Sequence, residues 1–439
     1  MPLNWRIEVE WEALQGAPAE EQACFGAIGI AVSNSWLTEG HDYLANRLRN
    51  RPYLSGYHLA EWLAWNWWRL RWEPRASSRE WGQTHSMASI GQGYIWPNIK
   101  IFSDGERTAL VSNPTPERPD TPFRYISNQS AVLPASQFEA GIDEFFARIL
   151  DRLDAQGVKG TNFHSIFESL REERSTPHLA TRRKLEALLG EDPDEMDPAI
   201  IEQLVSDAEE VSVEAIEEVA AARGQTGNPA ALKDLKALAE KSGFNASSRN
   251  AVRLHDRAGL APSENTPAWL IGSRAARALR EQERLGGRPI ADEKLAAFAG
   301  TSSKALAARH DRSADFSFIV DDQKDVAHVI LRSKWHEGRR FELARLLGDR
   351  LLVPQSNRLF PATRADTYRQ KMQRAFAAEF LSPFEEVEAI LQGDYSSDAQ
   401  RDAAEHFDVS PLMIRTLLVN HRRIPSEELG DDFDLAGAA

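Results

Sequence analysis

The sequence holds a single cysteine among its 439 residues, which excludes an internal disulfide and any zinc site built from cysteines of one chain. Cys24 lies in the apolar run from Ala23 to Val32. Such a setting predicts a buried, unreactive thiol and not a nucleophile. Chemistry, if the protein performs any, must therefore come from other side chains.

Long apolar runs are also missing, because none approaches the ~18 residues that a membrane-spanning helix requires. The N-terminus, from Met1 to Glu12, carries acidic residues where a secretory signal would carry basic ones. We therefore expect a cytoplasmic protein that makes no membrane contact.

Positive charge is in deficit, since 66 acidic residues against 52 basic ones give a formal net charge of -14. Non-specific coating of nucleic acid needs clustered Lys and Arg, so the composition excludes that class of function. A local basic patch is still compatible with the composition.

Tryptophan is absent between Trp96 and Trp269, whereas ten of the twelve Trp residues precede residue 97. This change of composition, in a chain longer than the ~150 residues of an average domain, indicates several domains. We predict a multidomain, α-rich α+β fold with these parts: a Trp-rich α+β domain (1–130), a helical acidic region (131–225), a linker and helix (226–266) and a C-terminal domain (267–439).

The Trp-rich region shows patterns of both strands and helices. Trp5 to Trp11 alternates apolar with polar residues, and Tyr94 to Phe102 is rich in aromatic and β-branched residues, so both segments favour strands. Gly56 to Trp72 reads as one helix whose apolar positions cover more than one face. Such a helix is expected to be buried between two layers or against a partner.

The Trp residues of this helix have a structural and a functional interpretation. Trp at helical spacing usually belongs to a core, so we expect Trp62, Trp65 and Trp68 to be largely buried. The alternative is a binding role for Trp65 and Trp68, as a stacking platform or an aromatic cage. His58 and His85 are interpreted as structural polar residues, because no nucleophile or second ligand is spaced to meet them.

The middle of the chain is helical in pattern. An amphipathic helix is predicted over 136–153, two shorter helices over 163–189, a helix or helix pair over 198–222 and another helix over 230–242. The many Glu residues of 198–222 give it an acidic outer face, which is either simply solvated or meets a basic partner. Residues 224–229 have the composition of a linker.

The C-terminal region contains an ordered series of short elements. Two helical segments between Trp269 and Gly300 precede two strand-like pieces, Phe316 to Val320 and Val326 to Leu331. A longer helix follows, running Arg339-Arg-Phe-Glu-Leu-Ala-Arg-Leu-Leu-Gly-Asp-Arg-Leu-Leu352. A further segment, Gln373-Arg-Ala-Phe-Ala-Ala-Glu-Phe-Leu-Ser-Pro383, precedes a tail of two short helical patterns.

In this order, the elements from Pro267 to Ile424 resemble the zinc metallopeptidase domain of the ImmA/IrrE family, over about a third of the chain. The family's core helix runs Arg-Phe-x-Leu-Ala and then His-Glu-x-Gly-His. Arg340, Phe341, Leu343, Ala344 and Gly348 match this frame. The resemblance implies a zincin-like domain with a small sheet before the core helix and a helical tail.

The residues that carry the family's chemistry are replaced. Zinc needs two His at i and i+4 on one helix face, with the intervening Glu as general base. Arg345, Leu346 and Asp349 occupy these places, and the family's third ligand falls near Gln370. The resemblance therefore implies no catalytic residue, no metal at this motif and no cofactor.

Arg345 and Asp349 carry opposite charges one helical turn apart. We predict that they form an ion pair in place of zinc, which makes them candidate binding residues. His336 and Glu337 begin like a zinc-protease motif, but Arg340 stands where the second His is needed, so His336 to Arg340 is interpreted as a loop. An alternative regroups His328, His336 and Asp349 into an unorthodox metal site.

The tail over Ala403 to Leu418 also resembles a helix-turn-helix, for which Arg415, Arg422 and Arg423 would be the nucleic-acid contacts. Nearby acidic residues balance these arginines, which favours a packing element of the protease-like domain.

ImmA/IrrE members act in bacterial regulation, commonly by cutting a helix-turn-helix repressor in mobile elements, toxin-antitoxin pairs or phage and stress responses. A copy without the ligands cannot cut. We therefore expect a catalytically inactive, regulatory or defence-associated interaction protein that acts as a sensor or scaffold for a protein partner. The alternatives are an enzyme with its active site in the Trp-rich domain and a DNA-binding regulator that acts through the tail.

Overall fold

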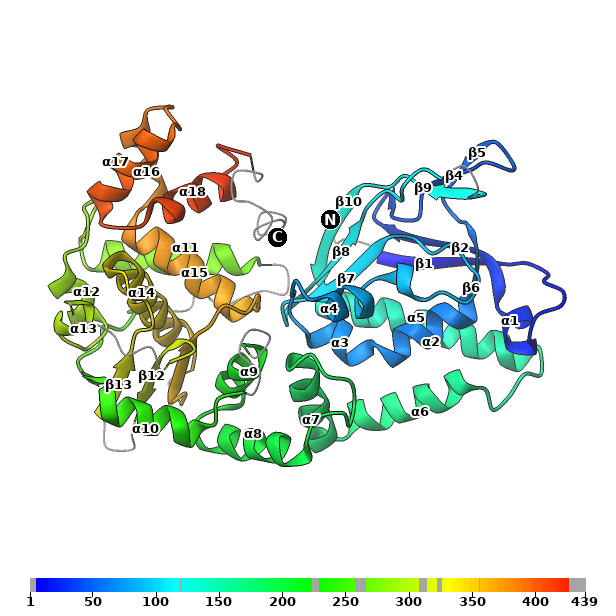
Figure 1. Ribbon diagram of the computed structural model, residues 1–439, viewed down its shortest axis with the longest axis horizontal. Helices are drawn as coiled ribbons and strands as arrows, with labels where there is room; N and C mark the ends of the chain where they lie inside the picture. Colours follow the sequence, from blue (N-terminus) through cyan, green and yellow to red (C-terminus); the bar gives the residue numbers. More distant parts are fainter. Residues whose placement is uncertain are drawn as a thin grey trace. The chain divides into compact units, whose positions relative to one another are not determined.

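The computed structural model describes residues 5–118, 121–222, 229–256, 260, 266–307, 314–321, 326–354 and 356–425. The chain divides into two compact units, Met1–Ile201 and Glu202–Ala439. The fold is α+β, about half helical with several small antiparallel sheets, as the sequence predicts (Figure 1). Within the described residues, no helix has the length and apolarity needed to cross a membrane.

The finer four-part division, with breaks near residues 130, 225 and 266, stays a prediction. Most of the predicted linker at 224–229 lies outside the described residues.

The first unit combines three antiparallel sheets with helices. One sheet pairs β2 with β1, β3 and β6, the second has the order β10-β8-β7, and the third the order β5-β4-β9. The strands are β1 Trp5–Trp11, β2 Phe25–Val32, β3 Ser35–Trp36, β4 Gly40–Asp42, β5 Arg47–Arg49, β6 Tyr53–Ser55, β7 Ile99–Ser103, β8 Arg107–Ser112, β9 Phe123–Tyr125 and β10 Gln129–Pro134. The helices are α1 Ala19–Ala23, α2 Gly56–Trp65, α3 Trp67–Trp72, α4 Arg79–Thr84, η1 Met87–Ser89, α5 Ala135–Ala155, α6 Asn162–Ser175 and α7 Pro177–Leu188.

The core of this unit forms where α5 packs against β1. The ring of Trp5 stacks on that of Phe138 with centroids 5.7 Å apart. A Cβ on Gly141 would come within 1.9 Å of the Trp5 ring nitrogen, so only glycine permits this approach. Arg148 of α5 donates hydrogen bonds to the carbonyls of Ile7 and Val9. The predicted first strand and the helix over 136–153 are thus confirmed.

The predicted single helix over Gly56 to Trp72 is wrong, because the chain breaks at Asn66 between α2 and α3. The Asn66 side chain donates to the Trp62 carbonyl at 2.9 Å and ends α2 there. Trp68 is buried as expected, but Trp65 is 59% exposed. The buried face of α2 is made of small and aliphatic residues at helical spacing, and Trp65 lies on the opposite face.

This exposure reverses the expected effect of truncating Trp65. We expect Trp65→Ala to change the free energy of unfolding by no more than about 0.5 kcal/mol, because surface side chains contribute little. Chemical denaturation of the full chain, with Trp65→Phe as the matched control, measures the change. A loss of several kcal/mol would instead place Trp65 in a core.

The second unit has one four-stranded antiparallel sheet of order β11-β13-β12-β14, with helices around it. The boundary between the units falls within α8. The strands are β11 Phe244–Ser247, β12 Ser317–Asp321, β13 Val326–Ile330 and β14 Leu359–Ala362. The helices are α8 Pro198–Glu210, α9 Val213–Ala221, α10 Leu232–Ser242, α11 Ala268–Gln282, α12 Asp292–Phe298, α13 Lys304–Ala307, α14 His336–Leu352, α15 Tyr368–Leu381, α16 Phe384–Leu391, α17 Ser397–Phe407 and α18 Pro411–Asn420.

Two glycines set how closely the central helices approach each other. A Cβ on Gly348 of α14 would meet the Phe376 ring of α15 at 2.5 Å, and one on Gly272 of α11 would meet the Met372 carbonyl oxygen at 2.2 Å. Helix α15 therefore lies in tight contact with both α14 and α11, and this contact places the polar side chains of α14 and α15 beside each other.

The structure differs from the sequence-based prediction at the start of α14. His336 to Arg340, predicted to be a loop, form its first helical residues. Trp335, in an extended conformation, is the N-cap residue directly before the helix. Glu337 supplies a negative charge in the first turn, where the helix dipole favours it.

Candidate functional site

Three polar residues that the sequence analysis singles out lie in the second unit. Arg345 and Asp349 lie on α14, Gln370 lies on α15, and all three are buried. Leu346, which follows Arg345 on α14, is part of the hydrophobic core. Positions that the sequence separates by 25 residues are therefore brought into one buried cluster.

Arg345 is held by uncharged acceptors. Its Nη2 donates to the Thr363 carbonyl at 2.6 Å, to Gln370 Oε1 at 2.5 Å and, more weakly, to Gln373 Oε1 at 3.4 Å. The amides of both glutamines donate in turn to the Pro361 carbonyl at 3.0 Å. Burial, with a smaller contribution from the charge of Arg374, lowers the pKa of the Arg345 guanidinium to about 9.

The predicted ion pair between Arg345 and Asp349 is wrong. Both oxygens of the Asp349 carboxylate accept from Arg369 of α15, from Nε and Nη2 at 2.7 Å each. Two parallel hydrogen bonds from a guanidinium are stronger than one contact made along a helix, so the partner from α15 prevails.

A further acidic group borders this cluster. Glu218 of α9 accepts a hydrogen bond from the Thr367 hydroxyl at 2.7 Å, and Thr367 also caps the start of α15. Burial raises the pKa of the Glu218 carboxyl, against the opposing charge of Arg369. Glu218 therefore links α9 to α15 as a buried, hydrogen-bonded group.

The cluster has the composition of a structural network and not of a reactive centre. Arg345 and Arg369 cannot ligate a metal, and the carboxylate of Asp349 is occupied by Arg369. Among the described atoms, Arg345 Nε and Arg369 Nη1 make no hydrogen bond. Two buried N–H groups thus stay without an acceptor in the protein, which distinguishes this cluster from an ordinary saturated core.

The alternative metal group of His328, His336 and Asp349 is also wrong. His328 lies on β13, opposite Val320 of β12, while Asp349 is bound by Arg369. His336 contacts Asp292 and Asp408 instead.

The tail arginines have local partners where the DNA-binding alternative needs free charge. Arg423 forms an ion pair with Glu388, and Arg415 donates a long hydrogen bond of 3.4 Å to Gln400. Arg422 follows α18 in a left-handed conformation. The two helices α17 and α18 flank the predicted Val-Ser turn, but the local charge remains nearly balanced.

In the first unit, the candidate polar residues make structural contacts. Nδ1 of His85 lies 2.6 Å from the Ile101 carbonyl and Nε2 lies 2.9 Å from Glu73, and the ring stacks on Trp81. His58 lies 3.7 Å from Glu21, which is longer than a hydrogen bond. Both residues connect neighbouring elements.

Cys24 is fully buried, and burial raises the pKa of its thiol to about 12, so the thiol is protonated at neutral pH. Trp68 is unavailable for stacking because it is buried and its Nε1 donates to Glu173 at 2.7 Å. Of the two Trp residues proposed for binding, Trp65 alone is exposed.

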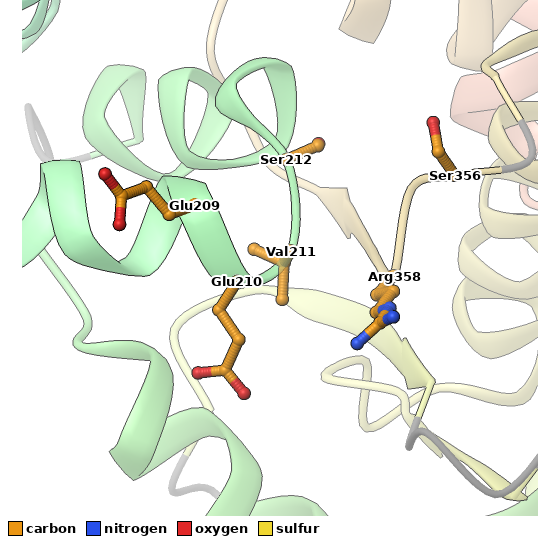
Figure 2. Close-up of a pocket in the computed structure, with 6 residues that line it drawn as sticks. All are labelled: Glu209, Glu210, Val211, Ser212, Ser356 and Arg358. Carbon is orange, nitrogen blue, oxygen red and sulfur yellow. The ribbon is translucent and has the colours of Figure 1, made fainter.

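A shallow depression lies beside the end of α8 (Figure 2). Glu209 and Glu210 of α8 line one side and Arg358 lines the other. The Arg358 backbone N–H donates to the Val211 carbonyl at 3.3 Å, which joins the two sides. This depression contains the acidic face predicted for α8, with a single basic residue opposite it.

Sequence reasoning missed several members of the buried cluster, namely Arg369, Gln373, Thr363 and Glu218. Arg369 directly precedes the predicted position Gln370, yet no spacing rule connects it to Asp349 twenty residues earlier. An unpaired acidic residue on a buried helix face was the one available signal, since such a residue requires a partner.

No protein-family model matches the chain, and comparisons with curated proteins and with solved structures return no match.

Proposed function

We propose that the second unit is an ImmA/IrrE-like domain without metallopeptidase activity, and that the protein is a regulatory or defence-associated scaffold or sensor for a protein partner. The observation that carries the proposal is the convergence of Arg345, Asp349 and Gln370 in one buried cluster between α14 and α15. Unrelated positions would have no reason to meet at the place where the resemblance puts a zinc ion.

The order of elements adds support. A small antiparallel sheet comes before and beside α14, and α15 carries the segment that resembles the family's second signature. The site itself provides neither a general base nor a ligand set, so binding is the activity left to it. Trp65, exposed on the first unit, is a candidate contact for the partner.

The two alternatives have less support among the described residues. An enzyme in the first unit would need reactive side chains, whereas His85 and Cys24 are buried and occupied by structural roles. DNA binding through the tail would need unpaired charge, whereas Arg423 is paired with Glu388.

Restoring the family's ligands tests the proposal directly. We expect the variant Arg345→His, Leu346→Glu, Asp349→His and Gln370→Glu to bind one zinc ion and to be stabilised by it, because ligand binding to the folded state raises stability. The reference chain, with His336→Gln as its one change, should take up less than one zinc per chain. Elemental analysis and zinc-dependent thermal unfolding of the full chain measure both.

The matched control carries Asn in place of the second His at residue 349, which removes one ligand at nearly equal size. All variants also carry His336→Gln, so that zinc bound elsewhere does not contribute. Circular dichroism establishes that both variants are folded. If zinc then stabilises the control as much as the restored variant, or stabilises neither of the folded variants, α14 is not a zincin active-site helix and the family assignment fails.

A further inference from the structure

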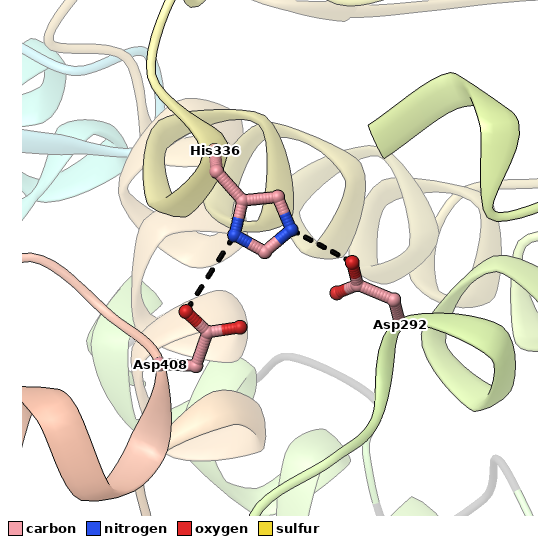
Figure 3. A group of neighbouring side chains, drawn as sticks. All are labelled: Asp292, His336 and Asp408. Atoms are coloured by element: carbon pink, nitrogen blue, oxygen red, sulfur yellow. Dashed lines mark hydrogen bonds and ion pairs between the residues drawn. The ribbon is translucent and has the colours of Figure 1, made fainter. Parts of the chain in front are cut away.

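Three side chains from three separate elements meet on the surface of the second unit (Figure 3). Asp292 is the first residue of α12, His336 is the first residue of α14, and Asp408 ends α17 in a left-handed conformation. His336 Nε2 lies 2.7 Å from Asp292 Oδ2, and Nδ1 lies 3.5 Å from Asp408 Oδ1. One nitrogen and one oxygen of each carboxylate all lie within 4.8 Å of one another.

A buried arginine, Arg340, contacts both carboxylates and holds them in place. Arg340, 1% exposed, bonds the other oxygen of Asp292 through Nη1 and lies 3.2 Å from Asp408 Oδ2 through Nε. Its Nη2 donates to the Ile290 carbonyl at 2.7 Å, which anchors the guanidinium. Arg340 thereby leaves the other oxygen of each carboxylate, Oδ2 of Asp292 and Oδ1 of Asp408, facing His336. Outer-sphere partners orient the ligands of a metal in the same way.

The charges of this group favour a cation. Two carboxylates and one guanidinium together leave a net negative charge beside the imidazole of His336. The three side chains are 25%, 36% and 46% exposed, so water can reach the remaining positions around an ion. One imidazole and two carboxylates are ligands that first-row divalent metals accept.

We propose that Asp292, His336 and Asp408 form a binding site for a divalent transition-metal ion. The ion would take one imidazole nitrogen and one oxygen of each carboxylate. Because the carboxylates lie beside different ring nitrogens, binding requires the imidazole to turn and both carboxylates to close on one of its nitrogens. The site is separate from the degenerate motif at Arg345 and Asp349, and it stands whether or not the proposed function does. The alternative is that the three residues hold no metal and form only an ion-pair cluster.

Binding at this site would connect three parts of the fold. The ion would hold the start of α14 to the start of α12 and to the turn between α17 and α18. Metal uptake would therefore restrain the helical tail relative to α14, the helix that contains Arg345. Metal availability would in this way determine how firmly the tail is held to α14.

Isothermal titration of the chelator-stripped full chain with zinc chloride tests the proposal. We expect one ion per chain for the natural protein and for His406→Gln, which changes an exposed histidine of α17 two residues from Asp408. We expect His336→Gln to abolish the binding, and Asp408→Asn to weaken it at least about tenfold. Asp408→Asn should disturb the backbone little, because Asn tolerates the left-handed conformation that Asp408 adopts.

Circular dichroism of each variant confirms that loss of binding is not loss of fold, and zinc should raise the unfolding temperature of the natural protein but not of His336→Gln. Zinc binding that persists in both His336→Gln and Asp408→Asn would overturn the proposal. So would a natural protein that takes up no zinc, since the group would then be only an ion-pair cluster.

Discussion

Replacing Asp349 by alanine is expected to lower the free energy of unfolding of the second unit by about 3–5 kcal/mol. The Asp349 carboxylate is fully buried and its two oxygens are both bonded to Arg369. Its removal strands a guanidinium that is itself 9% exposed. The cost is mainly that of an uncompensated buried charge and less that of the lost contact. Hydrogen exchange of amides in α14 and α15, measured in the full chain, follows the second unit by itself.

A double-mutant cycle measures the interaction energy between Asp349 and Arg369, apart from the contacts that each makes with other residues. Arg369→Ala strands the carboxylate instead, so each single change is severe, and the double change should cost less than the sum by about 0.5–3 kcal/mol. The control is Asp366→Ala, which breaks an exposed pair with Arg374 on the same unit and should cost at most about 1 kcal/mol. Additive losses at Asp349 and Arg369 would show that the two side chains do not meet in solution.

The same pair shows where sequence reasoning succeeded and where it failed. The sequence predicts a helix over Arg339 to Leu352, and α14 confirms it. The pairing was wrong because the i, i+4 rule describes neighbours on one helix. It contains no information about α15, whose Arg369 makes a bidentate contact that a residue on the same helix does not.

A similar limit applies to the Trp-rich helix. Composition predicted a helix, but one polar residue, Asn66, ends α2 and changes which face the following residues present. Trp65 precedes this break, and its exposure follows from helical spacing within α2, whose buried face holds Leu59 and Leu63. Trp68, after the break, is buried as expected, whereas Trp62 of α2 is only half-buried.

The cluster of Asp292, His336 and Asp408 lay beyond sequence reasoning altogether. Its members are separated by 44 residues or more, and no motif relates them. Only the packing of α12 and of the α17–α18 turn against the start of α14 brings them together. Sequence analysis had noticed His336, but had assigned it to a loop with the wrong partners.

Arg345 presents the opposite energetic situation from Asp349. Its hydrogen-bond acceptors are a backbone carbonyl and two side-chain amides, and the charges of Glu342 and Asp349 only partly offset the effect of burial. Burial is the largest cause of its lowered pKa, which means that the folded state disfavours the charged form. Because the pKa is lower in the folded than in the unfolded state, the energetic cost is fully present at every pH below about 9 and declines only above it.

Replacing Arg345 by methionine should therefore stabilise the second unit at neutral pH, by about 1–2 kcal/mol. Methionine keeps most of the length and volume but removes the charge. The opposing cost is limited, since the Thr363 carbonyl loses a donor while Gln370 Oε1 still accepts from the Thr363 N–H at 2.8 Å. Hydrogen exchange of α14 and α15 in the full chain measures the net effect.

Arg345→Lys is the matched control, because it keeps the charge and shortens the hydrogen-bonding reach; it should destabilise the unit. A loss of 2 kcal/mol or so in Arg345→Met would mean that the guanidinium's hydrogen bonds outweigh its burial and that Arg345 is a structural substitute for zinc. A gain would mean that the protein carries this charge at the expense of stability. That trade is typical of residues that serve function at the expense of stability.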